Sequence, residues 1–189
     1  MSKQNLVVIG ASTGGPQTVK RVFSKLPVLN ASIILVQHMP KYVNASFVKS
    51  MKRVANMEIK LISDGMPLEK GVVLVAPSEV HTEIIHNGIA KLVHGDKVNF
   101  VRPAIDVTMK SLVSGSKTNI IGVILTGMGS DGAEGLAYIK DVGGTTLAQD
   151  EASSIIYGMP KVAAATGKVD FILSPEAIAD KITELVQRK

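Results

Sequence analysis

The sequence predicts an α/β fold with a doubly wound, mainly parallel sheet, helices on both faces and a short antiparallel hairpin extension. Short runs of Val, Ile and Leu, typical of strands buried on both faces, alternate with segments whose apolar residues recur at helical spacing. The 189 residues are 46% hydrophobic and only 4% aromatic, which suits one compact domain with an aliphatic core. No internal repeat or low-complexity linker divides them.

The first sixty residues contain two expected strand–helix units. Residues 6–9 and 33–36 are aliphatic runs that predict buried strands. Pro16 suits the first turn of a helix extending to about Leu26, because proline has a fixed φ and needs no N–H partner there. Residues 42–55 show a second helical pattern. Its apolar face consists of Val43, Phe47, Met51 and Val54.

The middle of the chain has a different pattern. Residues 71–76, 80–85 and 89–93 are short strand-like runs. His86, Asn87 and Gly88 separate the last two runs and indicate a hairpin turn. We expect these runs to form an antiparallel extension of the sheet.

The second half returns to alternating helices and strands. Helical spacing covers residues 104–113, and the strongest strand pattern follows at 120–125. A glycine-rich loop at 127–132 then leads into a helix ending near Val142. The remaining expected elements are a strand at 145–148, a short helix opened by Pro160, a strand at 169–173, and a final helix capped by Ser174 with Pro175 just inside it.

Composition excludes several kinds of site. The chain has no Cys, so we expect no disulfide framework, no thiol nucleophile and no Cys-based metal site. No apolar run approaches the roughly 20 residues of a membrane span, and the first residues lack a signal-peptide pattern. We expect a cytoplasmic protein without membrane insertion, whose chemistry rests on hydroxyl, imidazole and carboxylate groups.

The net charge of +5 is unevenly distributed. Residues 1–60 contain nine Lys and Arg residues and a single acid, Glu58, whereas the rest contains twelve basic and fifteen acidic residues. This pattern is typical either of a solvated basic face or of attraction to an acidic partner. No zinc finger, basic zipper or RNP-type aromatic pattern accompanies the charge, so nucleic acid is not the expected partner.

A loop of small residues follows the first expected strand. Residues 10–15 read Gly-Ala-Ser-Thr-Gly-Gly and match the G-x-S-x-G elbow, in which small neighbours permit a sharp turn that exposes a Ser hydroxyl. Ser12 is therefore a candidate nucleophile. The same residues also suit a plain tight turn or an anion cradle at a helix N-terminus. The loop has neither the glycine spacing of a dinucleotide fingerprint nor the Lys of a Walker A motif.

His38 and Asp131 also follow expected strands, at 33–36 and 120–125. Each has a structural alternative, because a lone His is usually a hydrogen-bonded surface or half-buried residue and Asp is an ordinary helix N-cap. The weaker candidates are Asp106, which we place at a helix start, Asp150, Glu151, His86, His94 and His81, the last kept as a pocket-wall residue.

Ser12, His38 and Asp131 form the strongest combination. The carboxyl ends of parallel strands meet at one edge of a sheet, so the three side chains can converge there. A Ser–His–Asp set is recognised by geometry and not by chain order. The order here differs from the Ser, Asp, His order of α/β-hydrolases and argues for a separate hydrolase fold. From the residues alone the sequence predicts a serine hydrolase. The alternative is a binding module in which the loop cradles phosphate.

Six motifs, in order across nearly the whole chain, resemble the catalytic domain of the chemotaxis protein-glutamate methylesterases. The motifs lie at residues 9–16, 37–40, 75–77 with His81, 102–103 with Asp106, 125–133, and 148–151 continuing through 157–160. The resemblance implies one methylesterase catalytic domain over residues 1–189 with a doubly wound α/β fold. It implies hydrolysis of γ-glutamyl methyl esters on chemoreceptor cytoplasmic helices, and deamidation of particular receptor glutamines by the same nucleophile.

The resemblance also implies roles for particular residues. It assigns the nucleophile to Ser12, the base to His38 and the orienting carboxylate to Asp131. Met128 matches a family position beside the active site, and Thr13 and His81 complete the residues expected around the oxyanion or the substrate pocket. No metal or cofactor is implied.

Family members commonly carry an N-terminal phosphoacceptor receiver domain, and this chain starts too close to its first strand to include one. We therefore expect a stand-alone catalytic domain in two-component chemosensory signalling. Its expected partners are methyl-accepting chemoreceptors and a separate receiver protein. A serine hydrolase acting on small metabolite esters is a further alternative, using the same residues without receptor docking.

Overall fold

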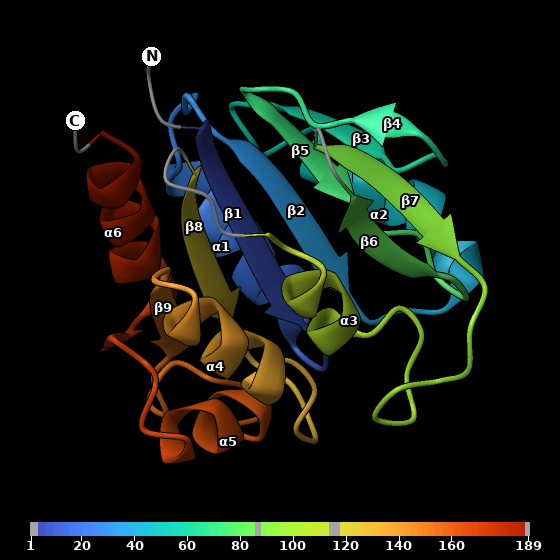
Figure 1. The fold of residues 1–189 in the computed structure, drawn as a ribbon. Helices are drawn as coiled ribbons and strands as arrows, with labels where there is room; N and C mark the ends of the chain where they lie inside the picture. The colour runs from blue at the N-terminus through green and yellow to red at the C-terminus, as the bar shows by residue number, and fades with distance from the viewer. Residues whose placement is uncertain (1–3, 86–87, 114–117, 188–189) are drawn as a thin grey trace.

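A seven-stranded, wholly parallel sheet forms the centre of the computed structural model, which describes residues 4–85, 88–113 and 118–187 (Figure 1). Its strand order is β10-β9-β8-β1-β2-β5-β3. The strands are β1 (Gln4–Ala11), β2 (Ser32–Gln37), β3 (Glu58–Leu61), β5 (Val72–Val75), β8 (Thr118–Ile124), β9 (Thr145–Gln149) and β10 (Phe171–Leu173). The predicted doubly wound α/β fold is confirmed.

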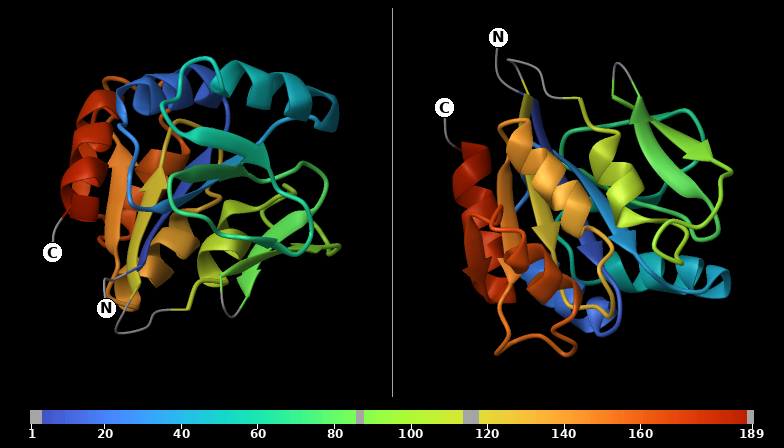
Figure 2. Two further views of the ribbon diagram at one scale, coloured as in Figure 1. Left: turned by 90° about the horizontal axis from the view of Figure 1, so that it is seen from above. Right: turned by 60° about the horizontal axis from the view of Figure 1, so that its bottom comes forward.

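Helices cover both faces of this sheet, as the view from above in Figure 2 shows. One face carries α1 (Gly15–Lys25), α2 (Asn44–Met51) and α6 (Pro175–Gln187). The other carries α3 (Ile105–Lys110), α4 (Ala133–Asp141) and α5 (Met159–Ala165). From β1 the chain adds strands towards the β3 edge of the sheet, and from β8 it adds strands towards the β10 edge, which is the opposite direction. Because parallel crossovers are right-handed, their helices fall on opposite faces.

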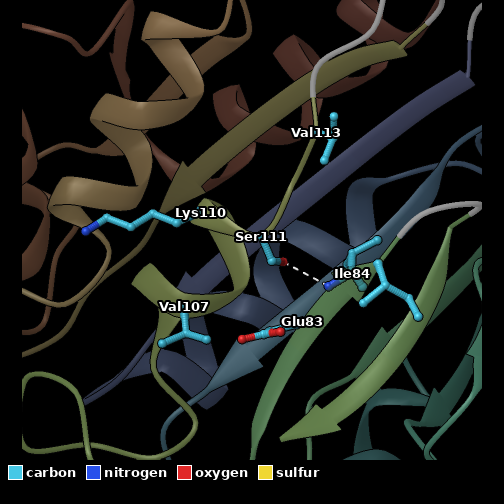
Figure 3. Close-up of a pocket in the computed structure, with 7 residues that line it drawn as sticks. Glu83, Ile84, Val107, Lys110, Ser111 and Val113 are labelled. Atoms are coloured by element: carbon cyan, nitrogen blue, oxygen red, sulfur yellow. Dashed lines mark hydrogen bonds between the residues drawn. The ribbon is translucent and has the colours of Figure 1, made fainter.

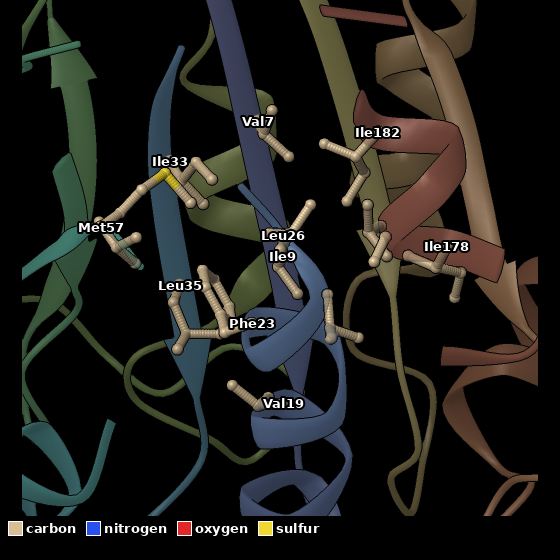
Figure 4. Packing of buried hydrophobic residues seen from close by; sticks show 14 of the residues in the cluster. Val7, Ile9, Val19, Phe23, Leu26, Ile33, Leu35, Met57, Ile178 and Ile182 are labelled. Carbon is tan, nitrogen blue, oxygen red and sulfur yellow. The ribbon is translucent and has the colours of Figure 1, made fainter. Parts of the chain in front are cut away.

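The core is aliphatic and is divided by the sheet into two clusters. In the cluster drawn in Figure 4, Phe23 of α1 packs with Ile9 and Leu35 from β1 and β2, and Ile178 and Ile182 of α6 extend the same layer. Seven consecutive residues of β1 are buried, as expected for a central strand covered on both faces.

The structure adds detail to the predicted hairpin extension. The predicted runs at 80–85 and 89–93 do pair antiparallel, as β6 (His81–Ile85) and β7 (Ile89–Val93). With β4 (Met66–Pro67) they form a separate three-stranded sheet, so they do not extend the main one. The run at 71–76 became β5, a parallel strand between β2 and β3. Of the predicted hairpin turn, His86 and Asn87 lie outside the described residues.

Two elements differ from expectation in extent. Strand β3 was not predicted, because this edge strand alternates exposed and buried residues over only four positions. The helix predicted over 42–55 is a 3-10 turn η1 (Lys41–Val43) followed by the shorter α2. Its predicted apolar face is nevertheless correct, since Phe47 and Met51 are buried and Val43 and Val54 pack against the same cluster.

Strand β1 is the point where the strand order reverses. It pairs in parallel with β2 on one side and with β8 on the other. Figure 1 shows the arrowheads of all three strands at the same edge, at the bottom of the view. In open α/β sheets, ligands bind in the crevice at such a switch point. No helix among the described residues is long and apolar enough to cross a membrane.

Close packing of α4 on β8 yields a test of this architecture. A Cβ at Gly122 of β8 would lie 2.7 Å from side-chain carbons of Ile139 and Leu136. We expect Gly122→Ala to lower the free energy of unfolding by about 1–3 kcal/mol, because an overpacked core must shift its neighbours. The measurement is urea denaturation.

Gly95→Ala is the matched control, since a Cβ there would meet its nearest neighbour, a ring carbon of His81, at an ordinary 3.7 Å. A Gly122→Ala midpoint equal to that of Gly95→Ala would contradict the packing described here.

Candidate functional site

Ser12 lies at the sharp turn between β1 and α1. Its backbone N–H donates to the Thr126 carbonyl (3.0 Å), and its own carbonyl accepts the N–H of Gly15 (2.8 Å). The residue is partly exposed. The turn therefore holds the Ser12 backbone by two hydrogen bonds and leaves the side chain at the edge of the sheet. The Ser12 N–H is already occupied, which counts against the alternative in which this loop cradles an anion.

The glycines around Ser12 are required by close packing. A Cβ at Gly10 would lie 2.6–2.9 Å from the Ile105 side chain, and one at Gly15 would lie 2.1 Å from Oε1 of Gln37. Gly14 has a φ of 78°, in the left-handed region. In the G-x-S-x-G pattern, the approach of α3 thus explains Gly10 and the left-handed backbone explains Gly14, while the approach of β2 explains the glycine that follows, Gly15.

Gln37 is a contributor that sequence reasoning missed. Its side-chain amide donates to the carbonyls of Ser12 and His38, both at 2.9 Å. It is buried at the end of β2 and ties the segment after β1 to the segment after β2. In the sequence, the only indication of this role is that Gln37 is a polar residue at the end of an apolar strand.

His38 directly follows β2 and faces Asp131. Its Nε2 lies 2.9 Å from Oδ2 of Asp131, and 12% of its side chain is exposed. A carboxylate partner fixes the proton on Nε2, so Nδ1 is the nitrogen with a free lone pair. The imidazole can therefore accept a proton at Nδ1 while Asp131 holds its other side.

Asp131 is buried, with 3% of its side chain exposed, and is surrounded by donors. Oδ2 also accepts the N–H of Ile105 (2.7 Å), and Oδ1 accepts the N–H of Asp106 (3.1 Å). Both N–H groups belong to the first turn of α3. Asp131 thus occupies the N-terminus of α3 and not that of α4, where Gly132 is the N-cap residue.

The electrostatics of Asp131 follow from these contacts. Burial by itself raises the pKa of the Asp131 carboxyl. The hydrogen bonds from His38, Ile105, Asn99 and Asp106 outweigh it and hold the pKa below its usual range. Asp131 is therefore a permanent anion beside His38 at neutral pH, in position to stabilise an imidazolium.

Asp106 and Asn99 form a second layer behind this pair. Asp106 is at the start of α3, as predicted, and its Oδ1 accepts the N–H of Gly135 (2.6 Å). The side-chain amide of Asn99 donates to Asp106 (2.8 Å) and to Asp131 (3.1 Å). Burial, with the nearby Asp131 charge, raises the pKa of Asp106. Sequence analysis did not identify Asn99.

The other sequence candidates have structural partners or lie exposed. His81 is buried and accepts the Ala104 N–H at Nδ1, while Nε2 contacts the Asp96 carbonyl. It supports the segment before α3 and is not among the residues that line the hollow beside His38. Asp150 accepts the Ser153 N–H (3.0 Å), and Glu151 is exposed. Thr13 and Met128 are exposed near the carboxyl ends of β1 and β8.

A hollow of about 360 Å³ opens beside His38. Its lining residues are His38, Met39, Pro40, Glu79, Lys97, Phe100, Val101 and Arg102. The largest exposed apolar side chain on its rim is Phe100, with 94% of its surface exposed. The hollow could receive a chain segment whose reacting group reaches His38.

A larger hollow of about 470 Å³, drawn in Figure 3, shares no lining residue with it. Its one hydroxyl, Ser111, accepts the Ile84 N–H (2.8 Å) and donates to the Thr108 carbonyl (2.7 Å). Ser111 has no imidazole partner, so this hollow lacks the groups of a hydrolase. In the described part of the chain, no group of three or more His, Asp and Glu residues could hold a metal ion.

Comparison with known proteins relates this arrangement to one family. The CheB methylesterase family model matches residues 7–182. Proteins named protein-glutamate methylesterase/protein-glutamine glutaminase are similar: that of Clostridium acetobutylicum is 41% identical over 182 residues, and that of Pyrococcus abyssi 42% over 185. These matches cover 96% of this chain but 53% and 50% of the two relatives, so the chain spans about half the length of the curated relatives it matches.

A solved structure agrees with the fold as well. The crystal structure of the Thermotoga maritima CheB methylesterase catalytic domain superposes with a TM-score of 0.91 at 38% identity, covering 98% of this chain and 100% of that one. The family model and the solved domain both extend over nearly the whole chain, and on that basis the chain belongs to the CheB methylesterase family.

Proposed function

We propose that residues 1–189 form one protein-glutamate methylesterase domain that removes methyl groups from γ-glutamyl methyl esters on the cytoplasmic helices of chemoreceptors. The observation that carries the proposal is the placement of Ser12, His38 and Asp131 after three adjacent parallel strands, with His38 bonded to Asp131. Family membership supports the reaction class. Deamidation of receptor glutamines would use the same nucleophile on an amide.

The proposed mechanism is a two-step acyl transfer. Ser12 Oγ attacks the ester carbonyl while Nδ1 of His38 accepts its proton, and Asp131 stabilises the resulting imidazolium through Nε2. The imidazolium then protonates the departing methoxide, so methanol leaves and a glutamyl ester of Ser12 remains. Water attacks this ester, His38 again accepts the proton, and the glutamate carboxylate is released with Ser12 restored.

Backbone N–H groups of Thr13 and Met128 are the proposed donors to the oxyanion. Within residues 4–85, 88–113 and 118–187, neither N–H is used in a hydrogen bond. Thr13 comes shortly after β1, and Met128 comes after β8 and the segment 125–127. Both strands end at the same edge of the sheet. Free donors aimed at developing charge are commonly the largest electrostatic contribution to such a reaction.

Loss of the Ser12 hydroxyl tests the nucleophile. We expect Ser12→Ala to reduce methanol release from methyl-labelled receptor membranes by several orders of magnitude, because no acyl-enzyme can form. Ser46→Ala, which removes an exposed hydroxyl on α2, is the matched control with unchanged turnover.

Near-wild-type release by folded Ser12→Ala would refute the assignment. If the wild-type chain released no methanol but a serine-directed phosphonate labelled Ser12, the receptor substrate would be wrong and the hydrolase retained. Saturable phosphate binding that survives Ser12→Ala, with no labelling, would favour a binding module.

Asp131→Asn tests the proton relay. An amide can donate to Nε2 and so favours the tautomer with hydrogen on Nδ1, which cannot accept the Ser12 proton. We expect kcat to fall by about 10⁴-fold, as in other triads. Asp150→Asn, a change at another loop of the same edge, is the control with kcat near wild type. Equal kcat in both variants would exclude a role for Asp131 in proton transfer.

Unpaired basic residues on α2 and just after it support steering of an acidic receptor helix. Among the described residues, Lys49, Lys52 and Arg53 have no acidic partner, whereas Arg21 and Lys25 pair with Glu176 and Asp180 of α6. These three cations lie on α2 or just after it.

We expect Lys49→Glu to reduce receptor turnover at low salt, with the difference fading as salt screens the charge. Lys25→Glu makes the same charge change on α1 and is the control. Turnover of a small neutral ester measures the reaction without steering. Salt responses that are alike for receptor and small ester would count against steering.

A further inference from the structure

A tight turn over residues 98–101 covers Asp131 from the solvent side. Val98 and Val101 exchange backbone hydrogen bonds of 3.2 and 3.0 Å, so Asn99 and Phe100 form the two central positions. Both have positive φ, 52° and 64°. Asn adopts this conformation more readily than most residues, whereas for a bulky aromatic residue it is unusual. The strained turn places the Asn99 side chain towards the interior while Phe100 stays almost fully exposed.

The Asn99 amide nitrogen carries two hydrogens, and each has a carboxylate acceptor. One acceptor is Oδ2 of Asp106 at 2.8 Å, and the other is Oδ1 of Asp131 at 3.1 Å. Only the nitrogen of the amide can satisfy two carboxylate oxygens. A side chain on the surface therefore bridges two buried acids.

The bridge completes the set of donors that fixes the plane of the Asp131 carboxylate. Oδ2 has two donors, His38 and the Ile105 N–H, and Oδ1 has two, the Asp106 N–H and Asn99. The three donors other than His38 therefore define the direction in which Oδ2 points. Asn99 is the only one of these three that is a side chain, so it can be changed without altering the backbone of α3.

The hydrogen bond from Asn99 to Asp106 adds to the effect of Asn99 on Asp131. Asp106 is buried, and in the described part of the chain its Oδ2 accepts no hydrogen bond other than that from Asn99. Without the amide, Oδ2 of Asp106 would lose its donor and no side chain would bridge the two carboxylates. Burial and the nearby Asp131 charge already raise the pKa of Asp106, and repulsion between two carboxylates without a bridging donor would weaken the acceptor that His38 needs.

We propose that Asn99 is a positioning residue for the acyl-transfer reaction, holding Asp131 in line with His38 by bridging it to Asp106. This inference rests on the proposed function. The side-chain hydrogen bonds of Asn99 go to Asp106 and Asp131 and not to His38, so it would act through Asp131. The role also gives a reason for a strained turn at this place, since this turn directs the Asn99 amide to both acids.

The test compares two substitutions in the hydrolysis of a small chromogenic ester. We expect Asn99→Ala to lower kcat about tenfold, a loss within the range of coupling between residues of one hydrogen-bonded network. Asn99→Asp keeps the shape but replaces the donor with a third carboxylate, so its loss should be larger. Asn56→Ala is the matched control, because Asn56 is also exposed and donates its amide inward, to the Leu26 carbonyl at 2.8 Å.

A double-mutant cycle separates positioning from loop stability. In the Asp131→Asn background, Asn99→Ala should change the residual kcat by less than twofold, since its route to His38 is already lost. A loss of the same factor in both backgrounds would overturn the proposal and assign Asn99 to general support of the loop. Wild-type kcat in Asn99→Asp would also overturn it. If the wild-type chain shows no Ser12-dependent hydrolysis at all, the proposed function fails and this inference fails with it.

Discussion

The charge of buried Asp131 is the constraint on which the rest of the site depends. A carboxylate removed from water stays ionised only if hydrogen-bond donors replace the solvent. Here the first turn of α3 supplies two N–H groups, so α3 has to begin at this point. Asp106 then binds the N–H of Gly135 in α4, and a Cβ at Gly135 would lie only 3.1 Å from its carboxylate. The need to solvate one anion thus determines how two helices meet.

Close approach of backbones is the second constraint, and it explains why small residues surround Ser12. Helix α3 packs on Gly10 through Ile105, the same residue whose N–H binds Asp131. On the other side, the Gln37 amide occupies the space that a side chain at Gly15 would need. The glycines therefore let the loop after β1 contact both α3 and β2. The elbow and the buried acid belong to one packed unit.

The sequence could predict features that depend on local patterns of residues, but not those that depend on contacts between distant segments. The fold class and the three candidate residues depend on local information, because short aliphatic runs mark parallel strands and polar residues directly after them must share an edge. Asn99 and Gln37 could not be found in that way, since their roles arise from contacts with Asp131, Asp106 and the carbonyls of Ser12 and His38. The edge strand β3 was not predicted from the sequence because half of its residues are polar. The separation of the small sheet depends on how β4 pairs with β7, which hydrophobic spacing does not encode.

The uneven charge along the sequence has a different distribution on the folded surface. The acids of α6 come from the end of the chain, yet they pair with Arg21 and Lys25 of α1 because the two helices lie side by side (Figure 1). Lys60 is likewise placed between Glu58 and Glu69. Folding thus cancels much of the excess between α1 and α6 and around Lys60. Among the described residues it leaves Lys20 of α1, and Lys49, Lys52 and Arg53 on or just after α2, without an acidic partner. A count by sequence position therefore overstates the basic surface, because it ignores the acids that folding brings from the end of the chain.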